Sequence, residues 1–134
     1  MVRIVSFAPY LAHTPNLYKE LCILTVRELY FYKICILVFK EIAELATCKR
    51  YGFAHVNHRY GTRRKCNNSL DLPSTKGRVT NYLLCCFRYI GPRCFNLLPQ
   101  QVRDCKNIAN FKKQLKHHLF SNNTDVYRIL YPHK

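Results

Sequence analysis

The sequence predicts a small α+β domain. Its 134 residues can form one core, and 49% of them are hydrophobic and 22% charged, as in folded soluble domains. Two stretches, residues 26–46 and 107–119, have helical periodicity, and residues 82–89 resemble a strand. The expected order is a long apolar helix, a basic loop, a β-hairpin, a Gly-Pro turn with a short helix, and a C-terminal amphipathic helix.

The first predicted helix runs from Val26 to Ala46. Thr25 and Glu28 have the spacing of a capping box, in which the hydroxyl and the carboxylate satisfy free amides of the first turn. Apolar residues then recur every three to five positions and define a broad stripe: Val26, Leu29, Tyr30, Ile34, Leu37 and Ile42, widened by Phe31, Ile36 and Phe39. We expect this stripe to face the core. The helix is apolar enough to need cover on most sides, from its own domain or from a larger protein.

The middle of the chain is predicted to be a basic loop followed by a hairpin. Residues 49–65 carry six basic side chains and no acidic one, which indicates a loop exposed to solvent. Residues 69–72 and 82–89 have strand-like patterns and flank the turn-like sequence Ser74–Gly77. The two strands are therefore expected to pair as a β-hairpin.

The last part of the chain is predicted to be a turn followed by helices. Gly91 and Pro92 supply the turn, and a short helix through Phe95 stops at Pro99. A final amphipathic helix begins near Asn107. Its apolar stripe consists of Ile108, Phe111, Leu115 and Leu119, and its other faces carry Lys112, Lys113, Lys116 and His117.

Positive charge is concentrated in the second part of the chain. The net charge is +15, from 22 basic and 7 acidic side chains, and residues 48–134 hold 17 of the basic and only 3 of the acidic ones. Such a segment favours an anionic partner, either nucleic acid or an acidic membrane surface. No transmembrane span is expected, because charged residues interrupt the most apolar stretch, residues 21–39.

Basic and aromatic side chains are interleaved in residues 49–65, as in surfaces that contact phosphates and stack on bases. Together with the lysines of the final helix, they predict salt-dependent binding of RNA or DNA with little sequence preference. The alternative is a solvated loop whose aromatic side chains pack on the core. The candidate binding residues are Lys49, Arg50, Arg59, Tyr60, Arg63, Arg64, Lys65, Lys112, Lys113 and Lys116.

Cysteine and histidine residues raise two further possibilities. A zinc site could use Cys48, His55, His58 and Cys66, but these lack the closely spaced pairs of structural zinc sites, so no metal or other cofactor is expected. Eight cysteines and two glycosylation sequons would also fit a secreted, disulfide-bonded protein. Because Cys22 and Cys35 lie in apolar helical patterns, free thiols and an intracellular location, nuclear or cytoplasmic, are favoured.

Four ordered blocks of the sequence resemble the region downstream of the polymerase domain in jockey-like non-LTR retrotransposon reverse transcriptases. The blocks are residues 21–30, 58–65, 87–99 and 111–116. Gly61 stands where this family usually has Asn, and Phe95 where it usually has Trp, which removes an indole N–H donor. The resemblance implies structural roles for the motif residues Thr62, Arg63, Gly91, Pro92, Phe95, Asn96, Leu98, Pro99, Phe111 and Leu115.

The resemblance covers residues 17–120 and implies that the chain is part of a larger protein. Residues 1–16 are expected to be irregular and residues 121–134 to form a tail. No enzymatic activity and no small-molecule substrate are expected, because a polymerase needs paired aspartates, and Asp71, Asp104 and Asp125 are far apart in the sequence. The resemblance and the charge imply a non-catalytic module that binds RNA or DNA. The alternative is an interaction module whose helix 26–46 docks on the missing polymerase part or on a second copy.

Overall fold

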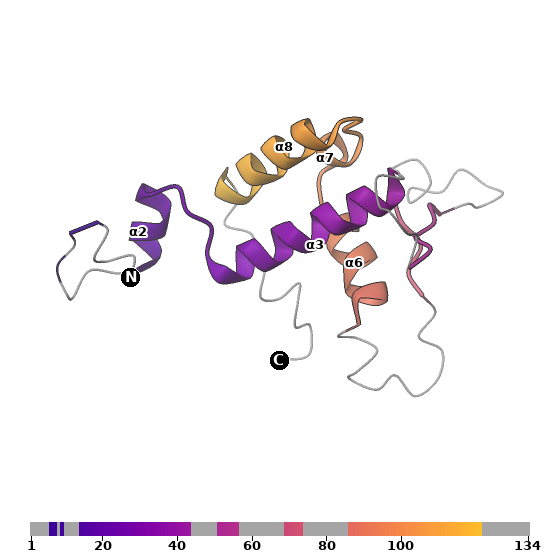
Figure 1. Ribbon diagram of the computed structural model, residues 1–134, viewed down its shortest axis with the longest axis horizontal. Helices are drawn as coiled ribbons and strands as arrows, with labels where there is room; N and C mark the ends of the chain where they lie inside the picture. The colour runs from indigo at the N-terminus through magenta and orange to yellow at the C-terminus, as the bar shows by residue number, and fades with distance from the viewer. Residues whose placement is uncertain are drawn as a thin grey trace.

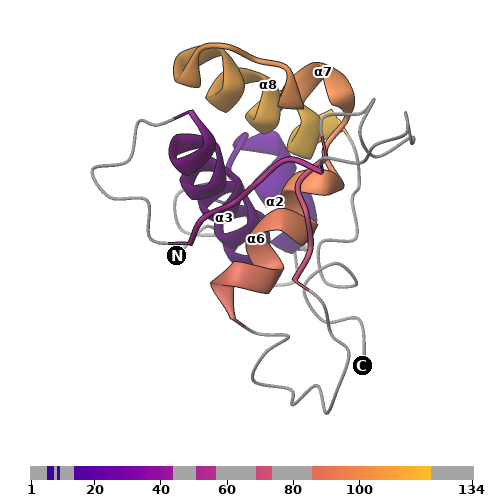
Figure 2. The same cartoon turned by 90° about the vertical axis from the view of Figure 1, so that its right-hand side faces the viewer.

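The computed structural model describes residues 6, 7, 9, 14–43, 51–56, 69–73 and 86–121. These residues form the helices α2 (Thr14–Glu20), α3 (Val26–Ile42), α6 (Phe87–Asn96), α7 (Gln100–Arg103) and α8 (Ile108–Ser121). Figures 1 and 2 show α3 in the middle, with α8 antiparallel along one side of it and α6 against another. The described part is helix-rich, and its extended structure is one antiparallel bridge between His55 and Leu70.

The long helix α3 begins at the predicted residue and ends earlier than predicted. Glu28 donates its backbone N–H to Thr25 Oγ1 at 3.4 Å, and Thr25 donates its N–H to Glu28 Oε2 at 2.7 Å, so both halves of the capping box are present. The last helical residue is Ile42 instead of Ala46. Just before this end, the buried Glu41 accepts two backbone hydrogen bonds at 2.8 Å, from Tyr51 and Gly52, and so holds the returning chain against α3.

The buried face of α3 agrees with the predicted stripe only in part. Its core residues are Phe31, Ile34, Cys35, Ile36, Val38 and Phe39. Of the predicted stripe, Ile34 and the widening residues Phe31, Ile36 and Phe39 are buried. The rest of it turns outward: Val26 is 79% exposed and Leu37 is 53% exposed, and Leu29 and Tyr30 are exposed as well. Since α3 is apolar on nearly all sides, its periodicity does not indicate which face turns inward. Its packing partners decide this.

The core is centred on three aromatic rings from three helices. The ring of Phe111 in α8 stacks on Phe39 of α3, with 4.2 Å between centroids, and on Phe95 of α6, with 6.2 Å. Leu115 and Leu119 extend this contact along α8, so the predicted apolar stripe of the final helix does face the core. Each such buried side chain stabilises the fold by about 1.5–3 kcal/mol relative to an exposed one.

The predicted strand at 82–89 and the predicted Gly-Pro turn are both wrong in the described region. Phe87–Tyr89 form the first turn of α6, and Gly91 and Pro92 lie inside that helix. The reason is tertiary: a Cβ on Gly91 would lie 2.9 Å from Val38 Cγ2, so the glycine lets α6 approach α3 closely. The apolar pattern at 87–90 reflects this packing against α3 and not a strand.

A different pairing takes the place of the predicted hairpin. Val56 donates its N–H to the carbonyl of Ser69, and Asp71 donates to Ala54, both at 2.9 Å. The other edge of Leu70 is occupied by the Asn96 carboxamide, which accepts from the Leu70 N–H at 2.7 Å and donates to its carbonyl at 2.8 Å. An asparagine side chain on α6 thus provides the donor and acceptor that a third strand would supply.

At the N-terminal end, helix α2 covers Thr14–Glu20 and therefore overlaps the end of the segment 1–16 that the sequence predicts to be irregular. Its Leu17 is buried. In the described part of the chain, no helix combines the length and the apolarity that a membrane crossing requires.

Candidate nucleic-acid interface

Helix α8 is positioned by its capped start and by its buried stripe. Asn107 accepts a hydrogen bond at 3.0 Å from the backbone N–H of Ala109 and so caps the helix start. Phe111, Leu115 and Leu119 are buried on one side. Because these three side chains fix the rotation of the helix, the residues on its other side must face solvent.

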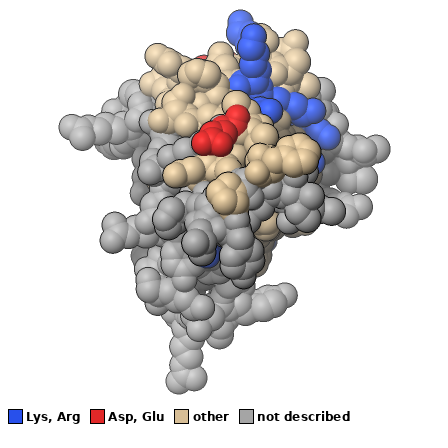
Figure 3. Space-filling view, turned by 90° about the vertical axis from the view of Figure 1, so that its left-hand side faces the viewer, with Lys and Arg blue, Asp and Glu red and all other residues tan. Residues whose placement is uncertain are grey.

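The solvent side of α8 carries the lysines predicted from the sequence. Lys112, Lys113 and Lys116 are all exposed, and Lys116 Nζ lies 5.6 Å from the centroid of the Phe120 ring. No acidic residue occurs between Asp104 and Asp125. In the face shown in Figure 3, lysine and arginine side chains gather at the upper right, and an acidic group lies beside and below them. Helix α8 therefore carries positive charge and has no acidic residue of its own.

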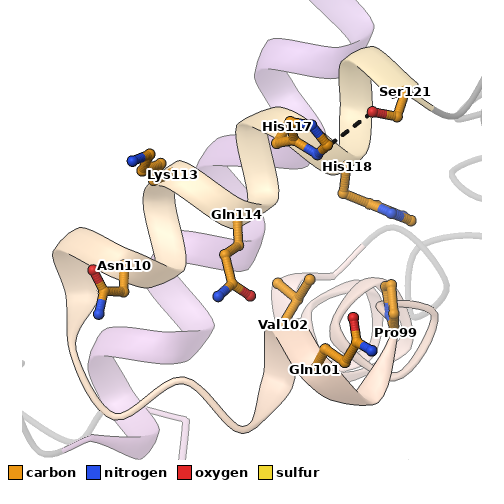
Figure 4. Close-up of a pocket in the computed structure, with 9 residues that line it drawn as sticks. All are labelled: Pro99, Gln101, Val102, Asn110, Lys113, Gln114, His117, His118 and Ser121. Atoms are coloured by element: carbon orange, nitrogen blue, oxygen red, sulfur yellow. Dashed lines mark hydrogen bonds between the residues drawn. The ribbon is translucent and has the colours of Figure 1, made fainter.

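A groove of about 810 Å³ lies between α7 and α8 (Figure 4). In Figure 4, Gln114 points from α8 toward Val102 on the α7 side, whereas Lys113 and His117 point away from α7. The residues that line the groove are Pro99, Gln101, Val102, Asn110, Lys113, Gln114, His117, His118 and Ser121. The groove thus combines carboxamides, which both donate and accept hydrogen bonds, with a lysine and two histidines.

The two histidines differ in their surroundings. His118 is half-buried, and its pKa is lowered from the ordinary value of 6.5, first by burial and then by the neighbouring His117. His117 is exposed, and its Nδ1 lies 3.5 Å from Ser121 Oγ. None of the nine lining residues is acidic, so within this lining the serine and histidine lack the third member of a Ser-His-Asp triad. The groove offers hydrogen bonds and positive charge to a ligand.

The structure covers only part of the predicted nucleic-acid surface. Lys112, Lys113 and Lys116 come together on α8. The other candidate residues, together with the motif residue Thr62, lie outside the described residues: Lys49, Arg50, Arg59, Tyr60, Arg63, Arg64 and Lys65.

The remaining motif residues of the family resemblance surround the core. Phe95, Leu98, Phe111 and Leu115 are buried, and Pro92 and Gly91 pack inside α6. Asn96 holds Leu70, and Pro99 is the N-cap residue of α7. Phe95 contacts the Phe111 ring, an apolar contact that needs no indole N–H.

The cysteines of the described segments are free thiols: Cys22, Cys35, Cys86, Cys94 and Cys105. Burial raises the pKa of Cys94 to about 12 and that of Cys35 well above its ordinary value, so both thiols stay protonated in the core. Of the candidate zinc ligands, His55 is described, and Cys48, His58 and Cys66 are not. Within the described ranges, no three histidine, cysteine or acidic side chains come close enough to hold a metal ion.

Sequence reasoning missed two parts of this region. The first is the row of amides in the groove, which the four-residue spacing of Asn110 and Gln114 on one helix face could have indicated. The second is Arg103, which is buried at the end of α7. Nothing in the local pattern distinguishes Arg103 from the other arginines of the chain.

Comparisons of the chain with protein-family models, with curated proteins and with solved structures found no match. The functional interpretation therefore starts from the geometry of α8 and the groove beside it.

Proposed function

We propose that this protein is a non-catalytic module that binds RNA or single-stranded DNA, and that α8 and the groove between α7 and α8 form its contact surface. The observation that carries the proposal is the orientation of α8. Its apolar stripe is anchored in the core, so Lys112, Lys113 and Lys116 are held together on the solvent side. Such a cluster binds the phosphate backbone with little dependence on sequence.

The spacing of the lysines suits a continuous anionic chain. Lys112 and Lys116 are four residues apart, which separates them by about 6 Å along the helix axis. Lys106 is exposed just before α8 and adds a further cation. A flexible single strand can follow these charges along the helix, and the amides of Gln101 and Gln114 in the adjacent groove can hydrogen-bond to base edges or ribose hydroxyls.

The proposed origin of the module is the C-terminal region of a jockey-like non-LTR retrotransposon reverse transcriptase. The four sequence blocks support this origin, and the packing roles of Gly91 and Asn96 give a physical reason for two of the motif residues. The decisive observation is genomic. A polymerase reading frame immediately upstream of Met1 supports the origin, and unrelated flanking sequence contradicts it.

Binding is tested with the full chain by fluorescence anisotropy on labelled single-stranded RNA, single-stranded DNA and duplex DNA at several salt concentrations. The variant Lys113→Gln/Lys116→Gln removes two charges from α8. We expect weaker binding and a log–log salt slope that is smaller by about 1.4, since each phosphate contact to a single strand contributes about 0.7. The matched control is Lys33→Gln/Arg88→Gln, which removes two exposed charges from α3 and α6.

The outcome of this comparison decides between a specific surface and general charge attraction. Equal losses in the two double variants would show that α8 is not the contact surface. Absence of binding at low salt by the unaltered chain would overturn the proposed function itself.

A second candidate function is protein interaction through α3. The exposed face of this helix carries the apolar residues Val26, Leu29, Tyr30 and Leu37, with Val26 79% exposed. Apolar side chains on one face of a helix are a common basis for docking to another helix or a groove. Sedimentation analysis of the full chain tests this: self-association that Leu37→Lys abolishes supports it, and a monomer at all concentrations excludes self-association.

A further inference from the structure

A second cavity, of about 430 Å³, lies at the C-terminal end of α7. It is lined by Phe39, Ile42, Ala43, His55, Phe95, Arg103, Asp104, Cys105 and Lys106. Its volume is in the range of about 300–1,000 Å³ that small-molecule sites occupy. One part of the lining is aromatic and aliphatic, and the other carries the side chains of Arg103 and Lys106.

Arg103 is the unusual member of this lining. It is a charged side chain that is only 8% exposed. Its Nη1 donates to Ser69 Oγ at 3.1 Å, and its Nε is buried without a hydrogen-bond partner. A guanidinium has five N–H donors, so the contact with Ser69 uses a small part of its capacity. A buried donor without an acceptor is unfavourable, so a small rotation of the Arg103 side chain that brings this N–H to an acceptor in the cavity is favoured.

The charge of this arrangement is suited to an anion. Burial lowers the pKa of Arg103, while the nearby Asp104 raises it, but the ordinary value of arginine lies so far above neutrality that the group stays protonated. Lys106 is exposed at the edge of the cavity and adds a second permanent cation. The carboxylate of Asp104 also lines the cavity, but it is exposed to solvent, where its charge is screened.

We propose that this cavity binds a phosphate group: a small rotation of the Arg103 side chain lets Nε and Nη2 donate to two phosphate oxygens, and Lys106 pairs with the remaining charge. The Nε–H and Nη2–H groups on one edge of a guanidinium are spaced to donate to two oxygens of a tetrahedral anion. The single ammonium group of lysine cannot form this paired contact. Ser69 orients the guanidinium from the opposite edge through Nη1. The same chemistry is presented by a free phosphate compound and by the terminal phosphate of a nucleic-acid strand.

In the first test, the full chain is titrated with inorganic phosphate, and chloride keeps the ionic strength constant. Binding is measured by calorimetry and by the NMR resonance of the Arg103 Nε–H group. We expect saturable binding, a shift of that resonance, and a loss of affinity of at least about tenfold in Arg103→Lys, which keeps the charge but lacks the fork. Lys106→Gln, an exposed change, should weaken binding several-fold. Ser69→Ala keeps the free edge of Arg103 and should retain most of the affinity.

Two results would overturn the proposal. One is the absence of saturable phosphate binding by the unaltered chain; the other is an unchanged affinity in both Arg103→Lys and Lys106→Gln. If Arg103→Lys does not fold, the test depends on the Nε–H resonance of the unaltered chain. An Nε–H chemical shift that phosphate does not change would contradict direct contact between phosphate and Arg103. Lys33→Gln serves as a matched control, since it removes an exposed lysine of α3 that lines neither the cavity nor the α8 surface.

A second measurement distinguishes a free phosphate compound from the terminal phosphate of a nucleic-acid strand. Oligonucleotides with a 5′-phosphate and with a 5′-hydroxyl are compared by anisotropy on the unaltered chain and on Lys106→Gln. Tighter binding of the phosphorylated strand that depends on Lys106 assigns the cavity to a strand end. Equal binding of both strands, with inorganic phosphate still bound, assigns it to a free phosphate compound. Phosphate binding is measured without nucleic acid. The phosphate site can therefore be disproved while nucleic-acid binding by α8 is supported, and the reverse is also possible.

Discussion

Helices α3 and α8 lie side by side and are both rich in apolar residues, yet they differ in what determines their orientation. In α8 the apolar residues form a single stripe, and lysines occupy the opposite side, so the helix can face the core in only one way. In α3 apolar residues occur on nearly all sides, and the face that turns inward is chosen by α6 and α8. The sequence of an amphipathic helix determines which face is buried, whereas the buried face of a helix that is apolar on all sides is determined by the elements that pack against it.

This difference also separates the two surfaces that the helices present to solvent. The outer side of α8 offers positive charge, which supports contact with an anionic polymer. The outer side of α3 offers Val26 and Leu37, which support contact with another apolar surface. Substitutions on the two helices and at their contacts test this contrast. The largest effect is expected in the core of α3 and the smallest at His118, near the end of α8.

The largest effect is expected from placing a charge on the two faces of α3. Val38 is fully buried and Leu37 is 53% exposed. Val38→Lys should prevent folding, because burying an ammonium group costs several kcal/mol out of a typical stability of about 5–15 kcal/mol. Leu37→Lys should change stability by no more than about 0.5 kcal/mol. Far-UV circular dichroism measures the helix content of the two variants, and urea unfolding measures their stability. Similar effects of the two variants would contradict the assigned buried face.

The next effect concerns the ring that joins α8 to α3. Phe111 is fully buried between Phe39 and Phe95, so Phe111→Ala should lower the free energy of unfolding by about 3–5 kcal/mol. Phe120, on the same helix, is 38% exposed. Phe120→Ala is the matched control and should cost about 1 kcal/mol or less, since its removal leaves no buried cavity. Equal losses in chemical denaturation would show that α8 is not anchored through Phe111.

A smaller effect is expected where α6 approaches α3. In Gly91→Ala the new methyl group would lie 2.9 Å from Val38 Cγ2, and overpacking of this kind costs about 1–3 kcal/mol. Adding Val38→Ala removes the clashing methyl group. The double variant should therefore lose less stability than the sum of the two single variants. Simple additivity in urea unfolding would show that the two residues are not in contact.

The smallest effect is a pH dependence that belongs to α8. The pKa of His118 is lowered in the folded state, so the unfolded chain takes up the proton first as pH falls. His118 therefore stabilises the fold above its unfolded pKa of 6.5, and this contribution decreases as pH falls through 6.5 toward the lower folded value. Melting temperatures between pH 7.5 and 5.5 should decline less steeply in His118→Gln than in the unaltered chain. The control variant is Gln114→Ala, an exposed change on the same helix that removes no titratable group and should leave the slope unchanged.

Local chemistry predicts the helix starts and the face of α8. The capping box at Thr25 and Glu28 and the cap at Asn107 depend on contacts within three residues, which a sequence displays directly. The lysine side of α8 follows from the four-residue spacing of Phe111, Leu115 and Leu119. The part of the candidate site that lies on α8 is therefore predictable from the sequence alone.

Contacts between distant segments decided everything else that the structure describes. Residues 87–89 are helical because α6 packs on α3 at Gly91, and Leu70 pairs with Ala54–Val56 and Asn96 instead of a following strand. Arg103 is buried at the end of α7, where folding brings Ser69 beside it from 34 positions away. The sequence by itself determined where helices begin and which side of an amphipathic helix is charged, since both depend on neighbours along the chain. The tertiary structure alone decided which face of α3 is covered and where the unpartnered guanidinium N–H lies, because both depend on residues that only folding brings together.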